Sequence, residues 1–193
     1  MRAALVLASE SPRRASLLAQ AGITPDRILP AEIDEAVRKD EPPRAHALRL
    51  AAEKARRVES EWNGGPAYIL AADTVVACGR RILPKAADEV QVRDCLRLLT
   101  GRRHQVMTAV ALVSPDGKLR TRLAMTRVSM LRLTDAQIAA YAESREGVGK
   151  AGGYAIQGRA ETFVKEIAGS YSNVVGLPLA LTVSLLAGAG YGL

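Results

Sequence analysis

The chain has 193 residues, 48% of them hydrophobic and 24% charged, which is typical of one compact globular domain over residues 1–193. No run of about 18 apolar residues occurs, and the apolar run near the N-terminus is too short for a secretory signal, so we expect a cytoplasmic protein with no membrane span. The net charge of +7 favours anionic partners, but the 4% aromatic content disfavours nucleic acid, so nucleotide phosphates are the better candidates.

The first elements predict the beginning of an α/β unit. Residues 3–8 are apolar and are bounded by Ser9 and Pro12, as expected of a buried strand. A helix should follow at once, with Ser11 as its cap, Pro12 in its first position and Gly22 after its end.

The next segment predicts a long helix and then a strand. Pro42 opens a helical pattern that ends near Trp62, where an Asn-Gly-Gly-Pro sequence stops it. Residues 68–77 form the most strand-like run of the chain, although Asp73 interrupts the apolar pattern. A turn then leads to a short apolar pair at residues 82–83.

Asp88 and Gln91 form a capping-box pattern that predicts a second helix, which Gly101 closes. Residues 106–113 and 119–130 alternate as strands do and are joined by a Ser-Pro-Asp-Gly turn, which predicts a long hairpin.

The C-terminal third predicts two more helices around a glycine-rich loop. Thr134 with Gln137 is a second capping box, for a helix through Tyr141. Residues 147–153 hold the loop, and the last helix follows Pro178. The alternation of elements predicts one α/β domain with a mixed, partly antiparallel sheet.

Arg13 and Arg14 lie in the first turn of a predicted helix. Cations at this positive end of the helix dipole are unfavourable by about 0.3–1 kcal/mol each unless an anion lies between them. With the free backbone N–H groups they would form a phosphate site, and the alternative is that both side chains extend into solvent.

Asp73 is a carboxylate within an apolar strand. A buried unpaired carboxylate is costly, so we expect Asp73 at a strand end or in a cleft. It could bind a hard cation such as Mg²⁺ or Mn²⁺ and accept a proton from water, or it could be a structural residue that accepts backbone hydrogen bonds.

Further polar residues are weaker candidates. Lys54, Lys85 and Lys150 are each typical of a solvated surface charge when taken alone. The glycine-rich loop permits close approach of a ligand, but it lacks the spacing of a P-loop. Gln157 has both a donor and an acceptor, as recognition of a base edge requires, and a structural amide is an equal alternative.

Four segments carry a resemblance that covers nearly the whole chain: LASESPRRASLL, AADTVV, ILPKAAD and KAGGYAIQGRAETFVKEIAGSYSNVVGLPL. In this order they resemble the Maf family, in its pyrimidine-preferring branch of bacterial dTTP/UTP pyrophosphatases. The resemblance implies an elongated α/β fold like that of inosine triphosphate pyrophosphatases, with a mixed sheet flanked by helices, a central cleft and often a homodimer.

The resemblance also implies residue roles. Asp73 would be the catalytic carboxylate and would bind a divalent metal, Mg²⁺ or Mn²⁺, together with Glu35. The substrate would be bound by Ser9, Arg13, Arg14, Lys54, Thr74, Lys85 and Gln157, of which Arg13, Thr74 and Gln157 match positions associated with substrate choice.

Three departures from the family pattern concern substrate preference more than the reaction. Gly149 stands where relatives commonly have Asp, the usual Gly-Lys-Pro is Pro84-Lys85-Ala86, and an Arg-Arg pair precedes Ile82.

The implied reaction is hydrolysis of a nucleoside triphosphate, dTTP, UTP or a modified pyrimidine nucleotide, to nucleoside monophosphate and pyrophosphate. One alternative is a 7-methyl-GTP pyrophosphatase of the sister branch. Another is a non-enzymatic regulator of septum formation or a nucleic-acid binder, which the lone Asp73 disfavours.

Overall fold

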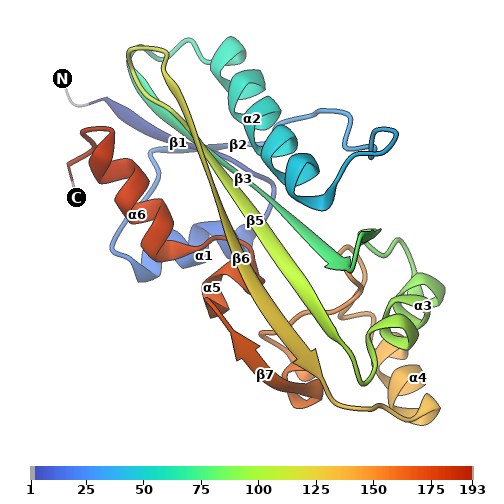
Figure 1. Ribbon diagram of the computed structural model, residues 1–193. Helices are drawn as coiled ribbons and strands as arrows, with labels where there is room; N and C mark the ends of the chain where they lie inside the picture. Colours follow the sequence, from blue (N-terminus) through green and yellow to red (C-terminus); the bar gives the residue numbers. More distant parts are fainter. Residues whose placement is uncertain (1–2, 193) are drawn as a thin grey trace.

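A seven-stranded mixed sheet runs through the computed structural model, which describes residues 3–192 (Figure 1). The strands are β1 (Ala4–Ala8), β2 (Arg27–Leu29), β3 (Ala67–Cys78), β4 (Arg81–Leu83), β5 (Arg103–Val113), β6 (Leu119–Met130) and β7 (Val164–Ala168). The helices are α1 (Pro12–Gln20), α2 (Pro43–Glu61), α3 (Glu89–Leu99), α4 (Asp135–Glu143), the 3₁₀ turn η1 (Arg159–Phe163), α5 (Tyr171–Val175) and α6 (Leu179–Gly188).

The strand order is β2-β1-β3-β5-β6-β7, with β4 also paired to β3. β1 is parallel to both β2 and β3, because a helix lies between β1 and each of these strands in the chain. β3, β5, β6 and β7 are antiparallel neighbours, and β5 and β6 form the expected long hairpin. The mixed α/β sheet predicted from the sequence is therefore confirmed.

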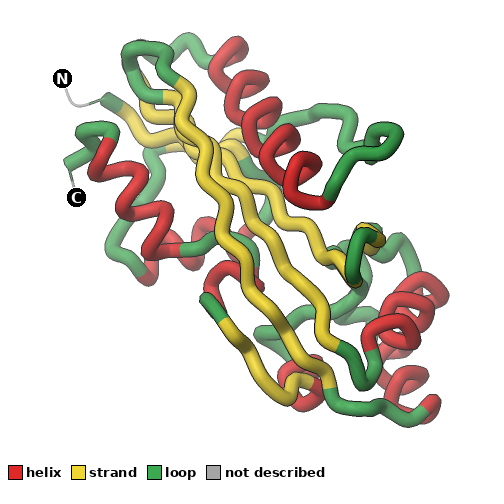
Figure 2. Tube along the Cα trace, viewed as in Figure 1, coloured by secondary structure: helices red, strands yellow, loops and turns green. Residues whose placement is uncertain are grey.

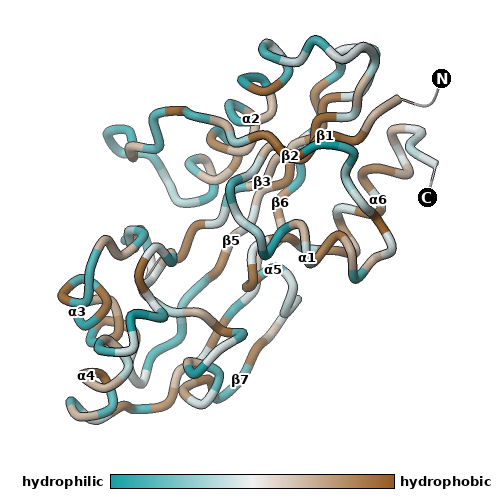
Figure 3. The backbone as a smooth tube through the Cα atoms, turned by 180° about the vertical axis from the view of Figure 1, so that it is seen from behind, coloured by the Kyte–Doolittle hydropathy of each residue, from teal (hydrophilic) through white to brown (hydrophobic). Residues whose placement is uncertain are grey.

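Helices cover both faces of the sheet (Figure 2). On one face α2 packs through alanines, whose small side chains allow close approach, against the alanines of β3 and β5. On the other face α1 and α6 contribute leucines to a core with β1, and Figure 3 shows apolar colouring along β1 and α6. A third core lies at the far end, beneath α3 and α4, and lengthens the molecule.

The edge of β3 that faces β1 is open in its middle. β1 pairs with residues 67–71 of β3 and β4 pairs with residues 76–78, whereas β5 pairs with the opposite edge over residues 69–77. Within the described chain, residues 72–75 have no strand partner on the first edge. Because side chains alternate along a strand, Asp73 points toward the α2 face at this opening and Thr74 toward the opposite face.

Some local predictions need correction. Ser11 occupies the N-cap position of α1, but its side chain makes no capping hydrogen bond, so the predicted side-chain cap is wrong. β3 continues through Asp73 without a break. The caps of α3 at Asp88 and of α4 at Thr134 are confirmed. No helix within residues 3–192 combines the length and apolar character needed to cross a bilayer.

Candidate active site

A cavity of about 740 Å³ lies at the open edge of β3. It brings together side chains from α1, α2, β3 and the loops before α2, before α3 and after α4. All of the site residues predicted from the sequence line it, namely Ser9, Arg13, Arg14, Glu35, Lys54, Asp73, Thr74, Lys85 and Gln157.

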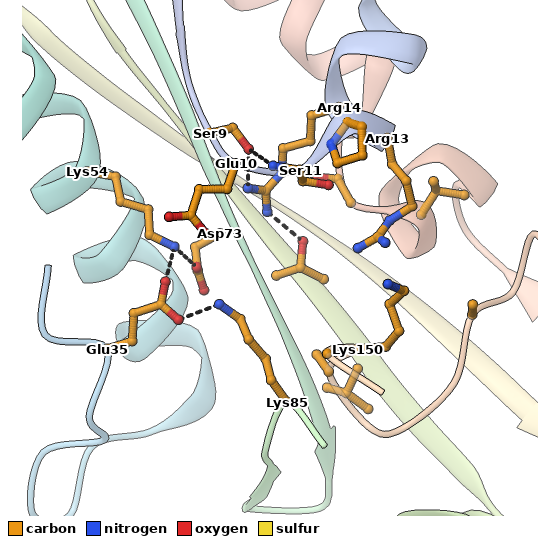
Figure 4. A pocket seen from close by; sticks show the side chains of 18 of the residues that line it. Ser9, Glu10, Ser11, Arg13, Arg14, Glu35, Lys54, Asp73, Lys85 and Lys150 are labelled. Carbon is orange, nitrogen blue, oxygen red and sulfur yellow. Dashed lines mark hydrogen bonds and ion pairs between the residues drawn. The ribbon is translucent and has the colours of Figure 1, made fainter. Parts of the chain in front are cut away.

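The α2 side of the cavity holds a chain of alternating charges (Figure 4). Lys54 Nζ lies 2.7 Å from Asp73 Oδ1 and 2.5 Å from Glu35 Oε1. Lys85 contacts the other oxygen of Glu35. Lys54 and Asp73 are buried, with 7% and 3% exposure, so the Asp73 carboxylate is neutralised by a partner, as a buried charge requires.

Glu35 is ionised at neutral pH. Burial on its own would raise the pKa of Glu35, but hydrogen bonds from Lys54 and Lys85, together with their charges, lower this pKa to about 2. The segment that carries Glu35 has no regular structure and is held by Arg49 of α2, which donates to the carbonyl oxygen of Ala36 over 3.0 Å.

Arg14 is fixed beside the opening by three acceptors. Its Nη1 donates to Ser9 Oγ over 3.1 Å and its Nε to the carbonyl oxygen of Gly176 over 2.8 Å. Its Nη2 donates to Thr74 Oγ1 over 3.3 Å. These partners are neutral, so the guanidinium charge of Arg14 remains available to an anion in the cavity.

Arg13 and Lys150 point into the cavity toward one another (Figure 4). Neither side chain has a hydrogen bond or an ion pair with any residue in the range 3–192. Burial, and then the charge of Arg13, lower the pKa of Lys150. Two facing cations without a carboxylate partner form a site for an anion.

The glycine-rich loop is joined edge to edge with the segment around Lys85. Gly149 N–H donates to the Ala86 carbonyl oxygen over 2.7 Å, and Ala86 N–H donates to the Lys150 carbonyl oxygen over 3.1 Å. At Gly152 a Cβ would lie 2.8 Å from Val76 Cγ1, so glycine permits this close approach. The pairing places Lys85 and Lys150 in the same cavity although 65 residues separate them in the chain.

Apolar side chains line part of the cavity on the side opposite α2, next to Arg13, Arg14 and Lys150. This apolar wall includes Val76, Val106, Ile156 and Val174, which belong to one hydrophobic cluster. Gln157 lies exposed at the border of this wall. The cavity therefore combines charged side chains with an apolar wall, as binding of a molecule with phosphates and an aromatic base requires.

The side chains of Asp73 and Glu35 are carboxylates, which are suitable ligands for a divalent cation. Both carboxylates already contact one cationic group, the Lys54 ammonium, so they converge on a position where a cation is stabilised. No group of three or more His, Cys, Asp or Glu residues within the described chain could hold a metal. A cation held by these two carboxylates would take its other ligands from substrate oxygens and water, as Mg²⁺ commonly does.

Glu10 and Lys150 are among the cavity residues that received no role in the sequence analysis. The position of Glu10 between Ser9 and the arginines is a local signal, whereas that of Lys150 depends on the pairing of two distant loops.

Comparison with known proteins supplies the family. The family model described as Maf-like protein matches residues 4–189. The chain is 58% identical to a dTTP/UTP pyrophosphatase of Caulobacter vibrioides over 188 residues, which cover 97% of this chain and 96% of the relative. It is also 58% identical to a dTTP/UTP pyrophosphatase of Brucella abortus over 191 residues, 97% of this chain and 92% of the relative.

Among solved structures, the chain is similar to a nucleoside-triphosphatase (dITP/XTP pyrophosphatase) of Mycobacterium abscessus. The TM-score is 0.42 and the identity 20%, over 67% of this chain and 74% of that one. With a family model matched over nearly its whole length and relatives at 58% identity, the chain belongs to the Maf-like protein family.

Proposed function

We propose that the protein hydrolyses nucleoside triphosphates, dTTP and UTP foremost, to the nucleoside monophosphate and pyrophosphate with the help of a divalent metal. The relatives at 58% identity bear the name dTTP/UTP pyrophosphatase. The observation that carries the proposal is the cavity at the open edge of β3, where paired carboxylates lie beside cations that have no carboxylate partner among residues 3–192.

Asp73 and Glu35 are the proposed metal ligands. A divalent cation supplies neutralisation of phosphate charge and makes water more acidic. The chain's own part is to hold both carboxylates in place, through Lys54 between them and Lys85 beside Glu35.

Asp73 is also the proposed proton acceptor. The oxygen of a water molecule attacks the α-phosphorus, the bond from this phosphorus to the bridging oxygen breaks, and pyrophosphate leaves. The proton of the water passes to the Asp73 carboxylate, which is the general base.

Phosphate oxygens are bound by the cationic side chains and by Ser9. Arg13, Arg14 and Lys150 provide positive charge where negative charge collects on the leaving pyrophosphate. The apolar wall of the cavity, with Gln157 at its border, would receive the base.

The test is pyrophosphate release from a panel of dTTP, UTP, dCTP, the purine triphosphates and 7-methyl-GTP, with Mg²⁺, with Mn²⁺ and with EDTA. We expect metal-dependent release that is fastest with dTTP and UTP. Preference for 7-methyl-GTP would move the protein to the sister branch. No release from any triphosphate, together with tight salt-sensitive binding of DNA or RNA, would contradict the proposal.

We further propose one domain over residues 1–193, assembly as a homodimer and a cytoplasmic location. The continuous sheet supports the first proposal. The resemblance supports the dimer, which light scattering after size exclusion tests, and the location is the one expected from the sequence.

A further inference from the structure

A chain of hydrogen bonds runs from the cavity into the sheet behind Thr74. Thr74 of β3 lies directly opposite Thr108 of β5, and their hydroxyl oxygens are 3.0 Å apart. Thr108 Oγ1 donates in turn to the main-chain carbonyl oxygen of Asn173 over 2.9 Å. On the cavity side, Arg14 Nη2 donates to Thr74 Oγ1 over 3.3 Å.

These bonds fix the direction of each hydroxyl proton. A carbonyl oxygen only accepts, so the single proton of Thr108, which is fully buried, lies toward Asn173. Thr108 can therefore only accept from Thr74, and Thr74 uses its own single proton in that bond. Arg14 occupies one of the two lone pairs of Thr74. Thr74 is left with one free lone pair and no free proton.

Ser9, the other hydroxyl that Arg14 contacts, can donate a hydrogen bond to a ligand where Thr74 can only accept one. Its hydroxyl oxygen accepts from the N–H of Ser11 over 3.1 Å and from Arg14 Nη1 over 3.1 Å. Both lone pairs are used, so the Ser9 proton is free to donate. A phosphate oxygen, which is an acceptor at neutral pH, can bind at Ser9 but not at Thr74.

We propose that Thr108 makes Thr74 an acceptor-only contact, and that Thr74 therefore binds a hydrogen-bond donor on the nucleoside of the substrate. This inference rests on the proposed function, because it takes the ligand to be a nucleoside triphosphate. Thr74 faces the same side of the sheet as Val76 and Val106, which belong to the apolar wall of the cavity. Thr108 does not line the cavity, so it is a positioning residue.

A thymidine nucleotide has two hydrogen-bond donors that could bind Thr74, namely the N3–H of the base and the 3′-hydroxyl of the sugar. Each has an analogue of similar size that has no donor at the same position. In dCTP the N3 atom is a bare acceptor, and in 3′-deoxy-3′-fluorothymidine triphosphate fluorine replaces the hydroxyl. The test compares kcat/KM for dTTP with that for each analogue in the parent protein, Thr108→Val and Thr108→Ser.

We expect the parent to favour dTTP about tenfold or more over one of the two analogues, as the loss of one buried hydrogen bond predicts. Thr108→Val frees the proton of Thr74, which can then turn toward an acceptor, so this ratio should fall several-fold. Thr108→Ser keeps the hydroxyl and should keep the ratio. General damage to the fold would lower all rates together and leave the ratio unchanged.

Equal kcat/KM for dTTP and both analogues in the parent would overturn the inference without any variant, even if Thr108→Val did not fold. Unchanged ratios in a folded Thr108→Val protein would also overturn it. Dissociation constants measured in EDTA give the same ratios without turnover. A parent that binds dTTP preferentially but releases no pyrophosphate would contradict the proposed function alone.

Discussion

Lys54 and Asp73 form a buried ion pair at the open edge of β3, with Nζ and Oδ1 2.7 Å apart and side chains only 9% and 4% exposed. The pair explains how a strand of the central sheet carries a carboxylate in its interior. It also places that carboxylate beside Glu35, which shares the same ammonium group.

Replacing Asp73 by Asn should lower turnover about 100-fold or more, because an amide neither accepts the proton of water nor carries the charge that a metal ligand needs. Nucleotide binding in EDTA should remain close to that of the parent, because the cationic side chains are untouched. Pyrophosphate release and titration calorimetry measure the two effects. Asp94→Asn, at an exposed site on α3, is the control. Equal turnover in Asp73→Asn and in this control would contradict the role of Asp73 as the catalytic carboxylate.

Replacing Lys54 by Met should destabilise the protein by about 3–5 kcal/mol, because it leaves the buried Asp73 carboxylate without its cation. Mn²⁺ should then stabilise the variant more than the parent, since the metal replaces the missing charge. Urea denaturation with and without Mn²⁺ measures both. Lys118→Met is the control, because the side chains of Lys118 and its partner Asp116 are 71% and 49% exposed. This substitution should change the free energy of unfolding by no more than about 0.5 kcal/mol. Equal stability of the two variants would contradict the buried-pair argument.

Most of the fold was predictable because its elements carry local signals. The long helix α2, the β5–β6 hairpin and the capping box at Thr134 all depend on residues that are close in the chain. β2 and β7 are three and five residues long and lie at the two edges of the sheet. They have little apolar alternation, so tertiary pairing decides them and the sequence pattern did not predict them.

The site was predictable only in part from its residues. A carboxylate in an apolar strand marks Asp73 without any structure, whereas the roles of Thr74 and Glu35 came from the family resemblance. The opening at residues 72–75 depends on where β1 ends and β4 begins along β3, which is a matter of register. The partnership of Thr74 with Thr108 depends on register as well, and no local pattern encodes it.

His104 should make stability depend on pH. It is buried, with Nε2 2.7 Å from the Tyr154 hydroxyl, and burial lowers the pKa of His104 from 6.5 to about 4. Between these values the unfolded chain binds a proton that the folded protein does not. The contribution of His104 to the free energy of unfolding is therefore fully present above pH 6.5, and it falls by about 3 kcal/mol as the pH drops to about 4.

Urea denaturation at several pH values between 7 and 4 measures this loss. His104→Gln should flatten the profile in that window, because it removes the titrating group. Tyr154→Phe removes the hydroxyl but keeps the imidazole, so it should keep the slope. A slope in His104→Gln equal to that of the parent would assign the pH dependence to other groups.

Arg13 and Lys150 should affect binding without supporting the fold. Their cationic ends face each other in the cavity and have no carboxylate partner among residues 3–192. Lys150→Met relieves this repulsion, so the free energy of unfolding should stay equal or rise. Affinity for inorganic pyrophosphate should fall about tenfold, the effect of one charge-assisted hydrogen bond, and the salt dependence of binding should weaken.

Calorimetric titration with pyrophosphate at two salt concentrations measures both effects on binding, and urea denaturation measures the stability. Lys165→Met, on an exposed site of β7, changes the net charge by the same amount but lies outside the cavity. It should leave the affinity almost unchanged, which separates a local contact from the general attraction of a basic protein for anions. If Lys150→Met and Lys165→Met bind pyrophosphate equally well, the two facing cations are not the phosphate site, and other cavity residues such as Arg14 and Ser9 must hold the phosphates.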